Sequence, residues 1–143
     1  MKTIIFDLDG TLADLQHRIE FAKKKDYREF FARVLLDAPI TDVIYMATVL
    51  KVAGHRIIIC SGRSDESKGD TEAWLQRNKV LYDALYMRRS GDHRPDYVVK
   101  AEIYNQYIRD KEDVLCVFDD RDSVVALWRS LGLRCYQVAK GNF

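Results

Sequence analysis

Cysteine and histidine are scarce in this sequence. The three cysteines, Cys60, Cys116 and Cys135, each lie inside or beside an apolar run typical of a β-strand, where a small thiol is usually buried. Their odd number and lack of paired spacing argue against a disulfide framework and for a reducing compartment. The three histidines show no metal-ligand spacing, which argues against a zinc site.

Long apolar runs and an excess of either charge are also missing. No apolar stretch approaches the length of a membrane span, and the first residues lead into a strand without a signal region. The 23 lysines and arginines nearly balance the 22 aspartates and glutamates, for a net charge of +1. Such a chain has no strongly basic field to concentrate nucleic acid, so any polyanion must be held by a local patch. We expect a soluble, cytoplasmic protein.

Repeats, linkers and low-complexity tracts are absent, and the length suits a single domain over residues 1–143. Strand patterns alternate with helical patterns five times, which predicts an α/β fold with a parallel sheet and helices on both faces. The expected strands are 4–6, 56–60, 84–87, 114–118 and 134–138. We expect one or two helices within 16–36, then helices starting at Thr41 or Asp42, at Asp70, near 96 and near 124.

Two carboxylates, a glycine and a hydroxyl follow the first expected strand. Gly10 ends this strand, so Asp7 and Asp9 fall at its carboxyl end. The run 61–63 (Ser-Gly-Arg) and the pair 119–120 (Asp-Asp) end two other expected strands. Ligands bind at this edge of an open α/β sheet, and the three polar clusters therefore predict one site there.

These residue types suit phosphoryl chemistry. Several carboxylates form an oxygen-only site that suits Mg²⁺. One aspartate can attack phosphorus, while the other, with a pKa raised by burial beside a carboxylate, donates a proton to the leaving oxygen and later accepts one from water. Ser61, the Gly62 turn and Lys100 offer donors for a phosphoryl group. Arg18 and Arg63 can add forked contacts to phosphate.

Two other functional interpretations fail on residue spacing. Residues 7–11 could begin a calcium loop, but the later ligands and the acidic end residue of such a loop do not follow. Cys60 could be the nucleophile of a cysteine phosphatase, but the position six residues on, where an arginine is required, is Glu66. We therefore interpret Cys60 as a core residue.

Two further features remain open. Asp96 and Lys100 are one helical turn apart, so they could belong to the site or simply pair with each other on a surface helix. The basic loop from Arg88 to Arg94 could be a solvated turn or a contact for a polyanion.

The chain resembles the haloacid dehalogenase superfamily of phosphohydrolases over its whole length. Residues 7–11 resemble the first motif of that superfamily, Ser61 the second, Lys100 the third and the pair 119–120 the fourth. A closer resemblance is to the 3′-phosphatase domain of phage polynucleotide kinase/phosphatase. The stretches that carry it are 6–13, 61–63, 96–100 with 102–103, 119–121, 128–129, 137–139 and 141–143.

The resemblance implies a three-layer α/β/α, Rossmann-like fold. Its five-stranded parallel sheet would have the order 5-4-1-2-3, with a minimal helical cap over about residues 14–40. The resemblance also implies that Asp7 is the nucleophile and Asp9 the general acid/base. Mg²⁺ would be held by Asp7, the Asp9 carbonyl and Asp120. The implied phosphate-binding residues are Thr11, Ser61, Gly62 and Lys100, and further residues needed for activity are Arg18, Arg63 and Asp96.

The expected function is Mg²⁺-dependent removal of 3′-phosphate from DNA or RNA ends through an aspartyl-phosphate, in nucleic-acid end repair. A small cap leaves the site open for a polymer end, but it also suits nucleotides, so a nucleotidase or small-metabolite phosphatase is an alternative. A non-catalytic module that binds nucleic-acid ends is another. The phosphate-binding loop of a kinase half is absent, which leaves open a stand-alone enzyme or one domain with a kinase or ligase partner. Oligomeric state and the choice between DNA and RNA are not predicted.

Overall fold

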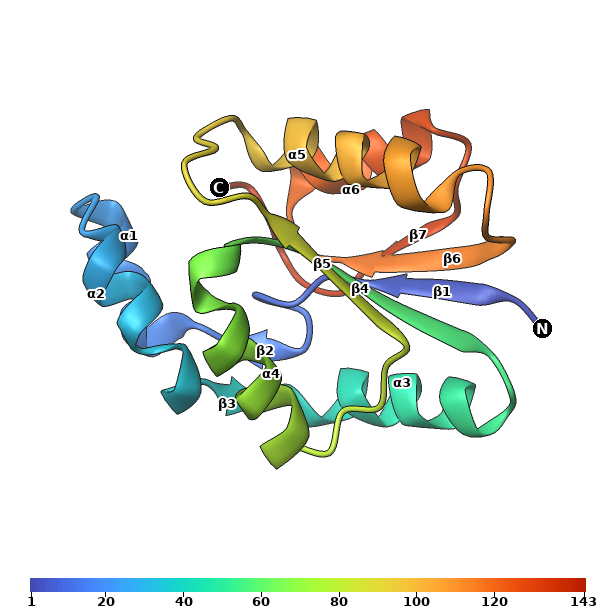
Figure 1. Cartoon of the computed structure of the whole chain (residues 1–143), viewed down its shortest axis with the longest axis horizontal. Helices are drawn as coiled ribbons and strands as arrows, with labels where there is room; N and C mark the ends of the chain where they lie inside the picture. The colour runs from blue at the N-terminus through green and yellow to red at the C-terminus, as the bar shows by residue number, and fades with distance from the viewer.

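A parallel sheet of five strands forms the centre of the computed structural model, which describes all 143 residues (Figure 1). The strands are β1 (Thr3–Phe6), β4 (Arg56–Ser64), β5 (Ala84–Arg88), β6 (Val114–Asp119) and β7 (Cys135–Gln137), in the spatial order β5-β4-β1-β6-β7. Numbered along the chain, this order is 3-2-1-4-5, which is the predicted 5-4-1-2-3 counted from the opposite edge. The Rossmann-like prediction is confirmed.

Helices cover both faces of the sheet (Figure 1). One face carries α3 (Thr41–Val52) and α4 (Lys68–Arg77). The opposite face carries α5 (Asp96–Ile103), which continues into the π-helical segment η4 (Tyr104–Ile108), and α6 (Asp122–Ser130). None of these helices has the length and apolar character needed to cross a membrane.

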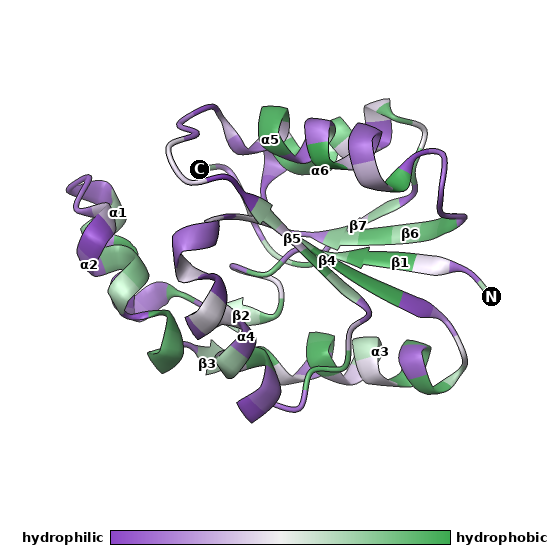
Figure 2. Cartoon of the chain, viewed as in Figure 1, coloured by the Kyte–Doolittle hydropathy of each residue, from purple (hydrophilic) through white to green (hydrophobic).

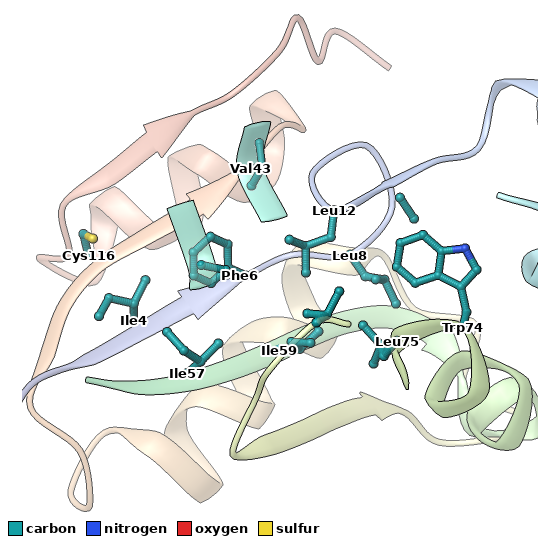
Figure 3. Packing of buried hydrophobic residues seen from close by; sticks show 13 residues of the cluster. Ile4, Phe6, Leu8, Leu12, Val43, Ile57, Ile59, Trp74, Leu75 and Cys116 are labelled. Atoms are coloured by element: carbon teal, nitrogen blue, oxygen red, sulfur yellow. The ribbon is translucent and has the colours of Figure 1, made fainter. Parts of the chain in front are cut away.

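The central strands are apolar on both faces because both faces are covered (Figure 2). Ile4 and Phe6 of β1 face a core that includes Trp74 of α4 (Figure 3), whereas Ile5 faces a second core that includes Trp128 of α6. Successive residues of a strand point to opposite faces, so this short strand contributes to two cores at once. The continuous apolar run that predicted a central strand has this physical origin.

The insert after β1 is a small cap built on a hairpin. Strand β2 (Ala13–Asp14) pairs antiparallel with β3 (Ala38–Pro39), which joins the two ends of the insert. Between them lie the short helices η1 (Gln16–Arg18), α1 (Ile19–Lys23), α2 (Tyr27–Ala32) and η2 (Val34–Leu36). Helical turns were expected here, but the hairpin was not, because two-residue strands leave no periodic pattern.

Several predicted element ends were wrong. The N-cap of α3 is Ile40 rather than Thr41 or Asp42, and that of α4 is Ser67 rather than Asp70, because a 3₁₀ turn over Asp65–Ser67 precedes it. Strand β4 was expected to stop before Ser61. It instead continues to Ser64, because its pairing with β5 resumes after an irregularity between Ser61 and Ser64.

Candidate active site

Three carboxylates meet where β1 and β6 end. Asp7 follows β1, Asp119 ends β6 and Asp120 comes next. One carboxylate oxygen from each lies within 4.8 Å of the others, and all three residues are buried. We call these residues the acidic cluster. Burial and the neighbouring charge of Asp119 raise the pKa of Asp7 well above its usual value. The pKa of Asp120 is also raised, mainly by burial.

Lys100 provides the cation of this cluster. Its Nζ donates to Asp7 Oδ1 at 2.7 Å and to Asp119 Oδ2 at 3.0 Å, and its side chain is 2% exposed. Burial acts to lower the pKa of Lys100, but Asp119 and Asp7 outweigh it and raise the pKa well above the usual value. Lys100 therefore pairs with Asp7 and Asp119, and the surface pair with Asp96 that its spacing allowed is not formed.

Gly10 and Thr11 fit closely around the acidic cluster. Gly10 has a φ of +82°, and a Cβ atom there would lie 2.1 Å from Asp120 Oδ2. Only glycine allows both this backbone conformation and this approach. Thr11 is fully buried, and its Oγ1 donates to Asp7 Oδ2 at 3.1 Å. Thr11 was predicted to bind phosphate, but its hydroxyl contacts the carboxylate of Asp7 in this structure.

Asp9 lies between two buried arginines. Arg18 Nη2 and Arg63 Nη2 each donate to Asp9 Oδ1 at 2.7 Å, and Arg63 Nε donates to Asp9 Oδ2 at 3.1 Å. Burial acts to raise the pKa of Asp9, but Arg63 and Arg18 outweigh it and lower the pKa. The expected raised pKa of Asp9 was wrong, because the carboxylate faces guanidinium groups and not other carboxylates.

Sequence reasoning missed Asp37, which binds the same two arginines. Its Oδ1 accepts from Arg18 Nε at 2.8 Å, and its Oδ2 accepts from Arg18 Nη2 at 2.8 Å and from Arg63 Nη2 at 3.0 Å. His17 Nε2 lies 2.7 Å from Asp37 Oδ1. We call Asp9, Arg18, Asp37 and Arg63 the arginine cluster. The only signal in the sequence was a single acid between apolar residues 34–36 and 38–40.

The turn after Ser61 is held by a second network. Arg88 Nε donates to the Gly62 carbonyl at 2.7 Å, and Arg88 Nη2 donates to Asp96 Oδ1 at 2.5 Å. Arg121 Nη1 donates to Asp96 Oδ2 at 3.1 Å. A Cβ atom at Gly62 would lie 2.7 Å from Asp96 Oδ1, so glycine is required for this packing. Arg88 therefore forms contacts within the protein, to the Gly62 carbonyl and to Asp96.

Ser61 and Cys60 precede this turn at the end of β4. Ser61 Oγ accepts from the Arg63 N–H at 3.1 Å, and the residue is 1% exposed. Cys60 is a free, fully buried thiol, and burial raises its pKa to about 12. The thiol is therefore protonated at neutral pH, as its interpretation as a core residue requires.

A cavity of about 590 Å³ opens over both clusters. Asp7, Asp119 and Asp120 line it together with Asp9 and Lys100. The cap and the loop between β5 and α5 both lie beyond the carboxyl ends of the strands and contribute to its lining (Figure 1). Its size is that of a small-molecule site, for which 300–1,000 Å³ is typical.

Comparison with known families agrees with this geometry. The family model of the polynucleotide kinase PNKP phosphatase domain matches residues 1–143. The chain belongs to this family. The predicted resemblance to the haloacid dehalogenase superfamily and to a polynucleotide kinase phosphatase domain is thereby confirmed. Membership of this family supports a phosphoric monoester hydrolase.

Relatives of this PNKP phosphatase domain include much longer proteins. A protein of Autographa californica nuclear polyhedrosis virus, described as a bifunctional polynucleotide kinase/RNA ligase, is 34% identical over 132 residues, which are 91% of this chain and 18% of the relative. A chain in the structure of the Pnkp1/Rnl/Hen1 RNA repair complex has a TM-score of 0.90 and 34% identity, with 99% of this chain and 43% of that chain covered. The chain thus spans less than half the length of either relative.

More distant structures share the fold alone. A haloacid dehalogenase-like hydrolase from Streptococcus pneumoniae has a TM-score of 0.69 and 12% identity, with 96% of this PNKP phosphatase domain and 84% of that chain covered. The sheet is therefore that of a large superfamily, whereas the arrangement of site residues has to support any narrower function.

Proposed function

We propose that this domain removes 3′-phosphate from RNA or DNA ends through an aspartyl-phosphate on Asp7. The observation that carries the proposal is the setting of Asp7: its carboxylate lies at the cavity wall, held by Lys100 and Thr11, with Asp9 two residues further on. The family match supports a nucleic-acid substrate, and the RNA ligase and RNA repair complex among the relatives support a role in end repair.

The acidic cluster fits a magnesium ion. Three carboxylates with oxygen atoms within 4.8 Å of one another provide only hard ligands. Burial and the neighbouring charge of Asp119 raise the pKa of Asp7 and of Asp120, and a bound cation would oppose both effects. Asp7 and Asp120 would hold the ion, with Asp119 close to both and the carbonyl of Asp9 as a further ligand. The bound ion supplies positive charge that keeps Asp7 ionised and offsets the charge of a phosphate.

In the first step, a carboxylate oxygen of Asp7 forms a bond to phosphorus, and the bond from phosphorus to the 3′-oxygen breaks. Asp9 gives its proton to the departing oxygen, which leaves as a hydroxyl. Asp9 has to be protonated for this step, and Arg63 and Arg18 oppose protonation because they lower its pKa. The negative charge of a bound phosphate would act in the opposite direction. Lys100, Ser61 and the turn at Gly62 donate to the phosphoryl oxygens.

In the second step, Asp9 accepts a proton from water. The oxygen of this water forms a bond to phosphorus, and the bond from phosphorus to Asp7 breaks, which releases inorganic phosphate and restores the carboxylate. Ionised Asp9 suits this role because Arg63 and Arg18 lower its pKa. Arg18 and Arg63 orient Asp9, and Asp96 positions the Gly62 turn through its contacts with Arg88 and Arg121.

The products and partners follow from this chemistry. A 3′-hydroxyl end is what a ligase requires, and the relatives described as a polynucleotide kinase/RNA ligase and as part of an RNA repair complex support kinase or ligase activities that act together with this domain. The three buried free thiols suit the reducing cytoplasm.

One assay tests the proposal. A 3′-phosphorylated oligonucleotide, a 5′-phosphorylated oligonucleotide, free 3′- and 5′-mononucleotides and a sugar phosphate are compared with Mg²⁺ and with a chelator. We expect preferential release of the 3′-phosphate and loss of activity with the chelator. Equal turnover of both oligonucleotide ends would contradict 3′ specificity, and faster turnover of free nucleotides would favour a nucleotidase. No turnover of any substrate would favour a binding module.

A further inference from the structure

One wall of the cavity is apolar and comes entirely from the cap. Its lining residues are Leu15, Ile19, Ala22, Tyr27, Phe30 and Phe31. Tyr27 and Phe31 are four residues apart on α2, so they lie on the same face of that helix. Tyr27 is 53% exposed and Phe31 is partly exposed, although both are large and apolar. None of the phosphate chemistry proposed above uses these two side chains.

Phe30 connects this wall to the arginine cluster. Its ring is buried and lies 4.3 Å from the guanidinium carbon of Arg18. The ring of Phe31 meets that of Phe30 edge to face, with centroids 5.2 Å apart. Arg18, which also donates to Asp9, therefore packs against the aromatic wall through Phe30.

Basic side chains from another segment also line the cavity. Arg89, His93 and Arg94 of the loop between β5 and α5 line it. Arg94 is paired with Asp92 and Glu102, whereas the exposed Arg89 has no ion pair or side-chain hydrogen bond. An unpaired arginine and an aromatic wall that line the same cavity suit a nucleotide, which has a flat base and an anionic backbone.

We infer that Tyr27 and Phe31 form a stacking platform for the base of the terminal nucleotide, with Arg89 facing the next backbone phosphate. This inference rests on the proposed function, because it places the 3′-phosphate at Asp7. The volume of about 590 Å³ accommodates more than a phosphate group. Stacking on aromatic side chains tolerates every base, so the platform selects nucleic-acid ends over sugar phosphates without selecting a sequence.

The first test measures stacking without turnover. The fluorescent nucleotide 2-aminopurine riboside 3′-phosphate is titrated into the Asp7→Asn protein, and saturable quenching is expected as the base stacks. Adding Tyr27→Ala or Phe31→Ala should weaken the Kd by roughly 5- to 100-fold. Phe31→Leu keeps an apolar side chain, so this variant should fold normally. It has no aromatic ring, so it should not restore the quenching. Tyr45→Ala on α3 removes another exposed tyrosine, outside the cavity, and should change nothing.

The second test measures turnover of two oligonucleotide 3′-phosphates, one with a normal terminal base and one with an abasic terminal sugar. The abasic end should have the higher KM in the wild-type protein, and Phe31→Ala should raise KM only for the end that carries a base. Equal losses on both substrates, or quenching unaffected by the substitutions, would overturn the platform. If the wild-type protein released phosphate from neither substrate, the proposed function would fail, while the fluorescence titration would still decide the platform.

Discussion

The acidic cluster and the arginine cluster contain the two aspartates of the same five-residue run, yet their electrostatics are opposite. Asp7 shares its surroundings with two carboxylates and one lysine, and its pKa is raised. Asp9 accepts from two guanidinium groups, and its pKa is lowered. Two aspartates only two residues apart therefore have opposite surroundings: carboxylates outnumber the one lysine around Asp7, whereas two guanidinium groups contact Asp9.

Because of this difference, the acidic cluster is suited to binding a cation, whereas the arginine cluster is suited to stabilising the fold. Crowded carboxylates cost folding free energy and become favourable when a cation or a cationic ligand arrives. The arginine cluster, in contrast, links the cap to the sheet. Arg18 and Asp37 come from the insert, whereas Asp9 follows β1 and Arg63 lies in β4. Four predictions test this distinction.

Asp7→Asn should have the largest effect on activity. Removing the nucleophile should lower phosphatase turnover by more than about 10³-fold. Because it also removes one crowded carboxylate, the Tm should stay the same or rise. Near wild-type turnover would show that the covalent mechanism is wrong, and a large fall in Tm would contradict the view that the acidic cluster costs stability.

Asp37→Ala should have the largest effect on stability. The substitution leaves Arg18 and Arg63 buried with one anion fewer, which should cost about 3–5 kcal/mol in the free energy of unfolding. Activity should fall as well, because both arginines orient Asp9. Denaturant unfolding checks this prediction, with Asp110→Ala as the control, since Asp110 is exposed and has no ion pair. A cost below about 1 kcal/mol would mean that the arginine cluster does not hold the cap.

Gly10→Ala should be worse than Gly54→Ala, although both glycines have a positive φ, +82° and +97°. The new Cβ atom would meet Asp120 Oδ2 at Gly10 but has open space at Gly54. We expect costs of roughly 2–4 and 1–2 kcal/mol. Only Gly10→Ala should also lose turnover, because Asp120 must shift. Equal costs and equal turnover would show that this close approach is unimportant.

The pH dependence of stability should differ in sign between the two aspartates, measured in a chelator. The folded-state pKa of Asp7 is raised above its ordinary 3.8, so the stability associated with its protonation is lost as pH rises through the folded-state pKa. The folded-state pKa of Asp9 is lowered, so its contribution is present above about 3.8 and is lost as pH falls through the folded-state pKa.

Single variants separate these two contributions. Asp7→Asn should therefore stabilise the protein most at neutral pH, and its advantage should decline as pH falls. Asp9→Asn should destabilise it at neutral pH, and that cost should decline below about pH 4. The Tm of both variants and of the wild type is measured from neutral pH to below about pH 4, which checks the direction of each change. The same dependence of Tm on pH in the two variants would contradict the distinction.

Much of the acidic cluster could be predicted from the sequence. Asp7 and Asp119 directly follow or end apolar strands, and parallel strands bring their carboxyl ends to one edge. Lys100 was named as a donor to a phosphoryl group from its residue type, although its spacing from Asp96 also allowed a surface pair. The resemblance implied Asp120 but not Asp119 as a metal ligand, and the structure brings both carboxylates close to Asp7.

The arginine cluster could not be predicted in the same way. Asp37 is 19 residues from Arg18 and 26 from Arg63, and no periodic pattern connects them. The hairpin of β2 and β3 brings these residues together through two-residue strands, which carry no recognisable signal. The lowered pKa of Asp9 followed from this arrangement and was therefore missed as well.

The pattern of the sequence indicated the parallel sheet and the edge at which the carboxylates collect, because continuous apolar runs are buried between two layers of helices. The order of the strands came from the resemblance to a known family. Tertiary structure alone decided the charge state around each carboxylate. Electrostatic energy depends on distances between residues far apart in the chain, and Asp7 and Asp9 differ because one faces carboxylates and the other faces guanidinium groups.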